Sequence, residues 1–274
     1  MSFKNLLLAF SGEKAFASSL SHAIKLAKHH DAWLTVIMRN GRSYFDRYGG
    51  GLSSALRDKL REVDDADTNA AIAQFETVVR DAGLTDRAEF IPPEVLGKTL
   101  PSEYARSYDL VITGFQSDLI GEEHHVVSPD LIALRSGRPV LVVPESYSAP
   151  ALSDHVLVAW DGKRAAARAL GDAMHIIEGK RQVTILTIGT DAEDSTTDAR
   201  ILRHLERHGI TATRLQRPAQ GRSVASVIED TADEVGAKLI VMGAYEHSKF
   251  SQDVFGGVTH DVLKTARVPV FMSH

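Results

Sequence analysis

An internal repeat is the feature that most constrains the fold of this chain. The segments LLAFSGEKAFASSL (Leu7 to Leu20) and LVAWDGKRAAARAL (Leu157 to Leu170) align without a gap, 150 residues apart. Near the end of each copy, GRPVLVVP (137–144) matches ARVPVFMSH (266–274) at a shift of 130 residues. The first copy is therefore longer, and its excess lies near residues 39–65. Because a repeat of this length is long enough for a whole domain, the sequence predicts two similar domains, 1–148 and 154–274, joined by a polar, proline-containing linker.

Strands and helices are expected to alternate in both copies, which is typical of an α/β fold with doubly wound parallel sheets. In the first copy, apolar runs predict strands at 6–10, 33–38, 89–91, 109–113 and 139–143, and helical spacing predicts helices at 13–29, 53–82, 98–107 and 126–135. In the second copy, strands are expected at 155–160, 182–188, 211–215, 239–242 and 270–272, and helices at 163–177, 194–208, 224–235 and 258–266. Ser223 is a candidate N-cap for the helix 224–235. The segment Arg39–Leu52, which contains three consecutive glycines, is expected to be a loop, and its role stays open.

Composition excludes several function classes. The 274 residues are 43% hydrophobic and 24% charged, as in an ordinary globular protein, and the net charge of −5 favours neither nucleic acid nor an anionic membrane as a partner. The sequence has no cysteine, which excludes disulfides and thiolate chemistry. The run Leu6–Phe10 is too short for a signal-peptide core, and no apolar run approaches the ~20 residues of a membrane span. We therefore expect a cytoplasmic protein.

The last 34 residues have the layout of an anion site. A buried strand ends at Gly243, a polar loop follows, and Gly256 and Gly257 come directly before a short helix. The N–H groups of the first helical turn have no partner within the helix, and the peptide dipoles place partial positive charge there. Phosphates bind at helix starts of this kind.

The spacing of these glycines resembles the nucleotide-binding signature of the universal stress protein family, G-x2-G-x9-G-[ST]. Gly243 and Gly256 fall on the first and third glycines, but Glu246 stands where the second belongs, and Gly257 stands where Ser or Thr belongs. VLVAWDG (156–162) is similar to the first strand of the family, which ends in an aspartate that contacts adenine, and Asp161 matches that position.

The whole chain resembles a tandem member of this family. The resemblance implies two five-stranded parallel sheets with strand order 3-2-1-4-5. It also implies that the fifth strands pair with each other, making an internal pseudo-dimer, and it allows a further homodimer. ATP or AMP is the implied ligand. A divalent cation enters the hypothesis only as a bridge between Glu246 and the phosphates.

The first copy departs further from the signature. Ser11 stands in place of the aspartate, Ser117 in place of the second glycine and Val127 in place of the third, which leaves Gly114 and Ser128 in register. Without those glycines the backbone cannot easily approach a phosphate. We therefore expect any nucleotide to bind in the C-terminal half only.

Glu246 limits the nucleotide hypothesis for the second copy. A carboxylate ~5 Å from a phosphate charge, at an effective dielectric constant of ~20, raises the energy by about 3 kcal/mol. A helix N-terminus returns only ~0.3–1 kcal/mol, at most ~2. Binding of ATP therefore needs Glu246 to turn away or a cation to bridge it, while Thr259 could supply the hydroxyl that Gly257 lacks. Asp161 also has an alternative role as a turn or N-cap residue.

Other patterns in the sequence give weaker evidence of a functional site. Glu122, Glu123, His124 and His125 could bind a metal ion, but a solvated loop is the favoured interpretation. His247, His260 and His274 match no metal-ligand spacing, and no hydrolase motif is present, so no catalytic residue is assigned. The leading hypothesis is a stress-associated protein that binds an adenine nucleotide. The alternatives are a nucleotide-free interaction or structural protein whose clefts are vestigial or take another small ligand, and a slow ATPase for which no general base can be named.

Overall fold

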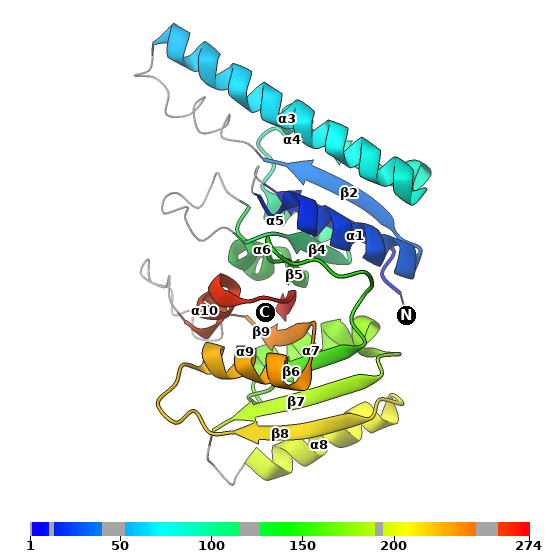
Figure 1. Ribbon diagram of the computed structural model, residues 1–274, viewed down its shortest axis with the longest axis vertical. Helices are drawn as coiled ribbons and strands as arrows, with labels where there is room; N and C mark the ends of the chain where they lie inside the picture. The colour runs from blue at the N-terminus through cyan, green and yellow to red at the C-terminus, as the bar shows by residue number, and fades with distance from the viewer. Residues whose placement is uncertain (1, 11–13, 40–52, 116–126, 190–193, 245–256) are drawn as a thin grey trace.

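The computed structural model of the chain describes residues 2–10, 14–39, 53–115, 127–189, 194–244 and 257–274 (Figure 1). Strands and helices alternate through both halves of this part of the chain. The strands of the first half are β1 (Asn5–Phe10), β2 (Trp33–Met38), β3 (Ala88–Ile91), β4 (Leu110–Thr113) and β5 (Val140–Val142). The helices of the first half are α1 (Phe16–His30), α3 (Ser54–Ala82), α4 (Pro93–Leu96), α5 (Pro101–Tyr104) and α6 (Pro129–Ser136).

The second half repeats this order. Its strands are β6 (His155–Ala159), β7 (Gln182–Ile188), β8 (Ala212–Arg217), β9 (Ile240–Gly243) and β10 (Val270–Ser273). Its helices are α7 (Arg164–Ile177), α8 (Asp194–Arg207), α9 (Val224–Val235) and α10 (Val258–Thr265). The fold class predicted from the alternation is confirmed.

The strands of each half lie in the order 3-2-1-4-5, and the two sheets join at their fifth strands. The combined ten-stranded sheet runs β3-β2-β1-β4-β5-β10-β9-β6-β7-β8. Strands β5 and β10 pair antiparallel, with Val140 opposite Met272 and Val142 opposite Val270, whereas the strand pairs within each half are parallel. Antiparallel pairing of equivalent strands relates the halves by a pseudo-twofold axis. The pairing of fifth strands that the family resemblance implied is present.

Side chains alternate across the pleat of the sheet into two cores. On β1, Leu6, Leu8 and Phe10 enter one core, while Leu7 and Ala9 enter the other. The first core is covered by residues of α1, α3, α7 and α8, and the second by residues of α4, α6, α9 and α10. Because both faces are covered by helices, the central strands β1, β4, β5, β9 and β10 are mostly apolar and buried, as expected for a doubly wound sheet. The edge strands β3 and β8 carry exposed polar residues.

One predicted helix is wrong in its extent. Of the helix expected over 98–107, only α5 and a short 3₁₀ turn over Ala105–Ser107 are present, and α4 precedes that range as a separate short helix. Gly97 ends α4 with φ 61°, and Pro101, which has no N–H to donate, is at the first position of α5. Proline is favoured at the first turn of a helix but breaks its interior, so a helix through Pro101 cannot form. For the same reason α6 begins at Pro129 rather than at 126.

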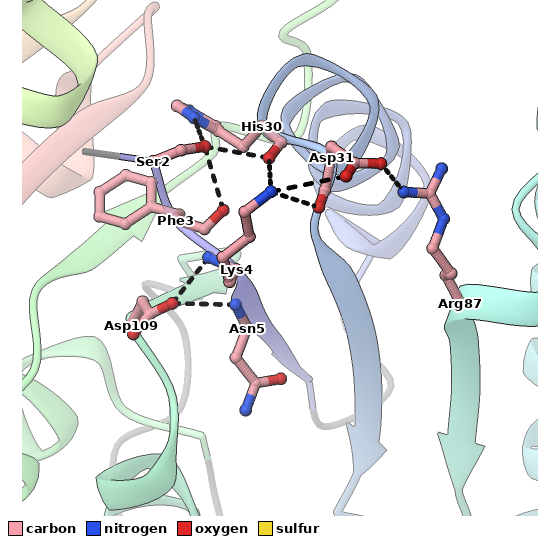
Figure 2. Close-up of polar contacts among 8 residues, drawn as sticks. All are labelled: Ser2, Phe3, Lys4, Asn5, His30, Asp31, Arg87 and Asp109. Atoms are coloured by element: carbon pink, nitrogen blue, oxygen red, sulfur yellow. Dashed lines mark hydrogen bonds and ion pairs between the residues drawn. The ribbon is translucent and has the colours of Figure 1, made fainter.

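Polar contacts fix the amino edge of the first half (Figure 2). The Asp109 carboxylate accepts hydrogen bonds from the N–H groups of Lys4 (2.7 Å) and Asn5 (2.9 Å), so it ties β4 to β1. The Lys4 ammonium donates to the carbonyls of His30 and Asp31, both at 3.1 Å, where α1 ends. The Asp31 carboxylate also pairs with Arg87, next to β3. These contacts hold the starts of three strands and the end of α1 in register.

Candidate functional site

The candidate site lies at the carboxyl edge of the second half, where the strand order reverses. Strand β6 has β7 on one side and β9 on the other. Helix α7, which follows β6, and helix α9, which precedes β9, lie on opposite faces of the sheet. Open α/β sheets bind ligands outside the carboxyl ends of the strands at such a point. Since Leu157 is level with Ile240 and Val158 with Val241, β6 and β9 end close together along this edge.

Asp161 follows β6 and stabilises the turn into α7. Its side chain is exposed, and its Oδ1 accepts a hydrogen bond from the N–H of Lys163 at 3.0 Å. Gly162, between them, has φ 75°, a conformation that favours glycine. Both interpretations of Asp161 therefore remain available: the residue is placed at the predicted edge, and it also acts as a turn residue.

Gly243 ends β9 under the first turn of α7. A Cβ atom at this position would lie 2.6 Å from the carbonyl carbon of Ala165 and 2.6 Å from the nitrogen of Ala166. Ala165 and Ala166 are 3% and 4% exposed, so the small side chains on the helix and the glycine on the strand permit this close approach. Close packing of α7 on β9 explains this glycine without a ligand.

The N-terminus of α10 points to the same edge, because α10 leads into the start of β10, which runs parallel to β9. Gly257 is the N-cap residue with φ 150° and ψ 170°, and its carbonyl accepts the first helical bond from Asp261 at 3.0 Å. This φ favours glycine, which gives a physical reason why glycine replaces the Ser or Thr of the family signature. Thr259 lies in the first turn and is buried.

The loop between β9 and α10 is only partly described. Glu246 and Gly256, two of the predicted site residues, lie outside the described residues, as does His247. Of the six predicted residues, the structure thus brings Asp161, Gly243, Gly257 and Thr259 to one end of the second half.

The equivalent edge of the first half is closed by apolar packing where the structure describes it. Val127, in place of the third glycine, is 6% exposed and belongs to the core beneath α6. Ser128 is the N-cap residue of α6, and its hydroxyl donates to the carboxylate of Asp130. Ser11 and Ser117 lie outside the described residues.

Contacts that sequence reasoning missed hold the rim of the candidate site. Phe115, just after β4, meets the ring of His260 on α10 edge-on, with centroids 5.7 Å apart, so the two halves touch beside the start of α10. The N–H of Ala244 donates to the carbonyl of Ser273 at 2.8 Å, and the Nδ1 of His274 lies 2.8 Å from the carbonyl oxygen of Ala244. The residues of these pairs are distant in sequence, so no local sequence pattern predicts the contacts.

The described residues hold neither a metal-binding cluster nor a membrane-spanning helix. No group of three or more His, Asp or Glu side chains in the described ranges could hold a metal ion, and the Glu122–His125 cluster falls outside them. No helix in the described part of the chain combines the length and apolar character that a membrane crossing needs.

Comparison with known proteins identifies the fold. Residues 189–274 match the model of the universal stress protein family. A universal stress protein from Archaeoglobus fulgidus DSM 4304 superposes with a TM-score of 0.69 over 98% of this chain and 96% of its own, at 17% identity. A proposed universal stress protein from Pseudomonas aeruginosa UCBPP-PA14 gives 0.58 over 99% and 93%, at 16% identity. No curated protein matches the chain. The chain therefore has the tandem, two-domain universal stress protein fold, with the sequence pattern of that family in residues 189–274.

Proposed function

We propose that this protein binds one adenine nucleotide at the carboxyl edge of β6 and β9. The observation that carries the proposal is the meeting of Asp161, Gly243 and the N-terminus of α10 where the strand order reverses. Crevices at such points are the usual ligand sites of open α/β sheets. The match of residues 189–274 to the universal stress protein family supports the same site.

The proposed arrangement places adenine by Asp161 and the phosphates by Gly243, Gly256, Gly257 and Thr259. The exposed carboxylate of Asp161 can accept a hydrogen bond from an adenine amino group while its Oδ1 accepts from Lys163, because a carboxylate has several acceptor sites. The start of α10 offers N–H donors and partial positive charge to a phosphate. No catalytic residue is assigned.

A nucleotide-free interaction protein is the second candidate, and two observations favour it. Gly243 is required by the approach of α7, and Asp161 stabilises its own turn, so both have structural roles without a ligand. Equilibrium titration of the full chain with ATP, AMP and adenosine distinguishes the two candidates. One molecule bound per chain supports the proposal, and the absence of binding with and without magnesium supports the alternative.

The variant Asp161→Asn tests the placement of adenine. A hydrogen bond to a charged group is worth about 1.5–3 kcal/mol, so the dissociation constant for adenosine should rise roughly 10- to 100-fold. Asp86→Asn, an exposed aspartate in the first half, is the matched control and should bind as wild type does. Equal affinity in Asp161→Asn and the control would contradict this role for Asp161.

Glu246→Gly tests the placement of the phosphates. The change removes a negative charge and frees the backbone, so ATP affinity should rise while adenosine affinity barely changes. A gain of ~2 kcal/mol is about 30-fold in dissociation constant. Titration of both proteins with ATP, AMP and adenosine, with and without magnesium, measures this. If ATP binding is unchanged, Glu246 does not face the phosphates.

A further inference from the structure

A cavity lies between the two halves at the end of the molecule opposite the candidate nucleotide site. It is lined by the last turns of α1, the segments that precede β6, β9 and β10, and the segment that follows α7. The space that the centres of water-sized molecules can reach is about 20 Å³, and the whole empty space, which includes open solvent at the mouth, is about 410 Å³. Because α1 belongs to the first half and the segment after α7 to the second, both halves contribute to its walls.

Among the described residues, the lining consists of six apolar residues, five basic residues and Ser153. The apolar residues are Leu26, Leu141, Leu152, Ile176, Leu239 and Pro269. The basic residues are His22, His29, His30, Lys180 and Lys238. No aspartate or glutamate is among the lining residues that the structure describes. Binding pockets for small molecules combine a mostly apolar wall with a few polar groups in this way.

The basic side chains that line the cavity have no acidic residue among the other described lining residues to balance their charge. Burial, followed by the positive charges of Lys25 and Lys180, lowers the pKa of His22 to about 4. Burial also lowers the pKa of His30 to about 4, with further lowering by His29, Lys180, His175 and Lys4. An anion in the cavity would favour the charged form of each of these groups.

The two lysines differ in their surroundings. Burial lowers the pKa of Lys180, and the negative charge of Asp154 only partly opposes this. Asp154 is also paired with Arg181, at 3.7 Å, so its charge is shared. Lys238 is exposed, and its backbone N–H is held by the carbonyl of His155 at 3.2 Å. A ligand can thus reach one half-buried ammonium and one exposed ammonium.

We propose that this cavity binds a small carboxylate with an apolar body, whose charged group pairs with Lys180 and Lys238. The apolar body lies against Leu26, Leu141 and Ile176, which come from α1, β5 and α7. An inorganic anion would satisfy the lysines but leave the apolar wall in contact with water, so it uses only part of the site. Because the walls come from both halves, the bound carboxylate stabilises their association.

Calorimetric titration of the full chain with butyrate at pH 7 tests the proposal. Butyramide has the same shape without the charge, and inorganic phosphate has the charge without the apolar body. Butyrate should bind once per chain, and both other probes at least about tenfold more weakly, as expected for losing a charge-assisted bond or the apolar contact. Butyramide binding as well as butyrate, or no butyrate binding, would overturn the proposal.

Variants locate the site and separate it from the nucleotide cleft. Lys180→Met and Lys238→Met remove the charge but keep an unbranched apolar side chain. Both positions lie outside helices and strands, so the fold should persist, and each change should weaken butyrate binding about tenfold. Lys28→Met is the control, because Lys28 is exposed on the last turn of α1 but does not line the cavity. A loss in Lys28→Met equal to that in Lys180→Met, or displacement of butyrate by saturating ATP, would place the carboxylate elsewhere.

The pH dependence gives an independent readout. When an anion raises the pKa of the buried His22, binding takes up protons, so butyrate should bind more tightly at pH 5.5 than at pH 7. Titration in buffers of different ionisation enthalpy measures this uptake. His22→Gln should abolish part of it while Lys180 still binds the carboxylate. Identical proton uptake in wild type and His22→Gln would contradict the placement beside His22.

Discussion

At the scale of single residues, the short distance between strand β9 and helix α7 explains why residue 243 is a glycine. The first turn of α7 comes so near β9 that any side chain at position 243 would meet the backbone of Ala165 and Ala166. Gly257, by contrast, has open space around it and is favoured by its φ of 150°. The two glycines of the signature are therefore required for different reasons: Gly243 because a side chain would clash with α7, and Gly257 because of its backbone conformation.

Gly243→Ala should destabilise the protein. The added methyl group must push α7 away from β9, and overpacking of this kind typically costs about 1–3 kcal/mol. Gly171→Ala is the control: Gly171 lies within α7, and nothing is within 4 Å of an added Cβ atom. That change should be neutral or stabilise by about 0.4–1 kcal/mol. Urea unfolding of the two variants measures the difference, and equal stability would contradict the steric account.

At the scale of elements, helix α9 shows how a local signal sets a boundary. Ser223 precedes the helix with extended backbone, and its Oγ accepts from the N–H of Ser226 at 3.1 Å. The N-cap predicted from the sequence is confirmed. Gly236 ends the same helix with φ 71°, so residues at both ends fix its length.

Ser223→Ala should lower the free energy of unfolding by about 1 kcal/mol, because one N–H group at the start of α9 loses its acceptor. Ser54→Ala, which changes an exposed serine at the first position of α3 whose N-cap residue is Ser53, is the control and should change stability by less than about 0.5 kcal/mol. Chemical denaturation of both variants is the measurement. An equal effect of the two changes would show that the Ser223 hydroxyl does not stabilise the helix.

At the scale of the whole molecule, buried histidines at the junction of the halves make stability depend on pH. Burial and nearby lysines lower the pKa of His22 from 6.5 to about 4 in the folded protein. Between these pH values the unfolded chain binds more protons, so the contribution is complete above about pH 6.5 and is lost as the pH falls toward 4. For the buried His22 the full effect is roughly 3 kcal/mol.

His22→Gln should therefore reduce the loss of stability between pH 7 and pH 4.5. His208→Gln, which changes an exposed histidine at the end of α8, is the control and should lose as much stability as the wild type. Urea unfolding at both pH values measures the difference for each protein. If His22→Gln loses as much as the control, protonation of His22 does not couple to unfolding.

The sequence by itself determined the fold class, the repeat and most element boundaries. Those features depend on periodicity and on local chemistry, such as the cap at Ser223 or the apolar runs of the strands, which are encoded within a few residues. The helix expected over 98–107 was wrong in its extent although the sequence holds the local signal against it, Pro101. Of the candidate site, the family resemblance in the sequence predicted that Asp161, Gly243 and the start of α10 belong to one site.

The tertiary structure decided what depends on residues far apart in the chain. The steric requirement for glycine at position 243 depends on the distance between β9 and α7. The contact of Phe115 with His260 depends on how the two halves are arranged. The basic, apolar cavity likewise combines α1 with segments that precede β6, β9 and β10. Contacts of this kind arise only when the chain packs, since no local pattern specifies which side chains from distant elements become neighbours.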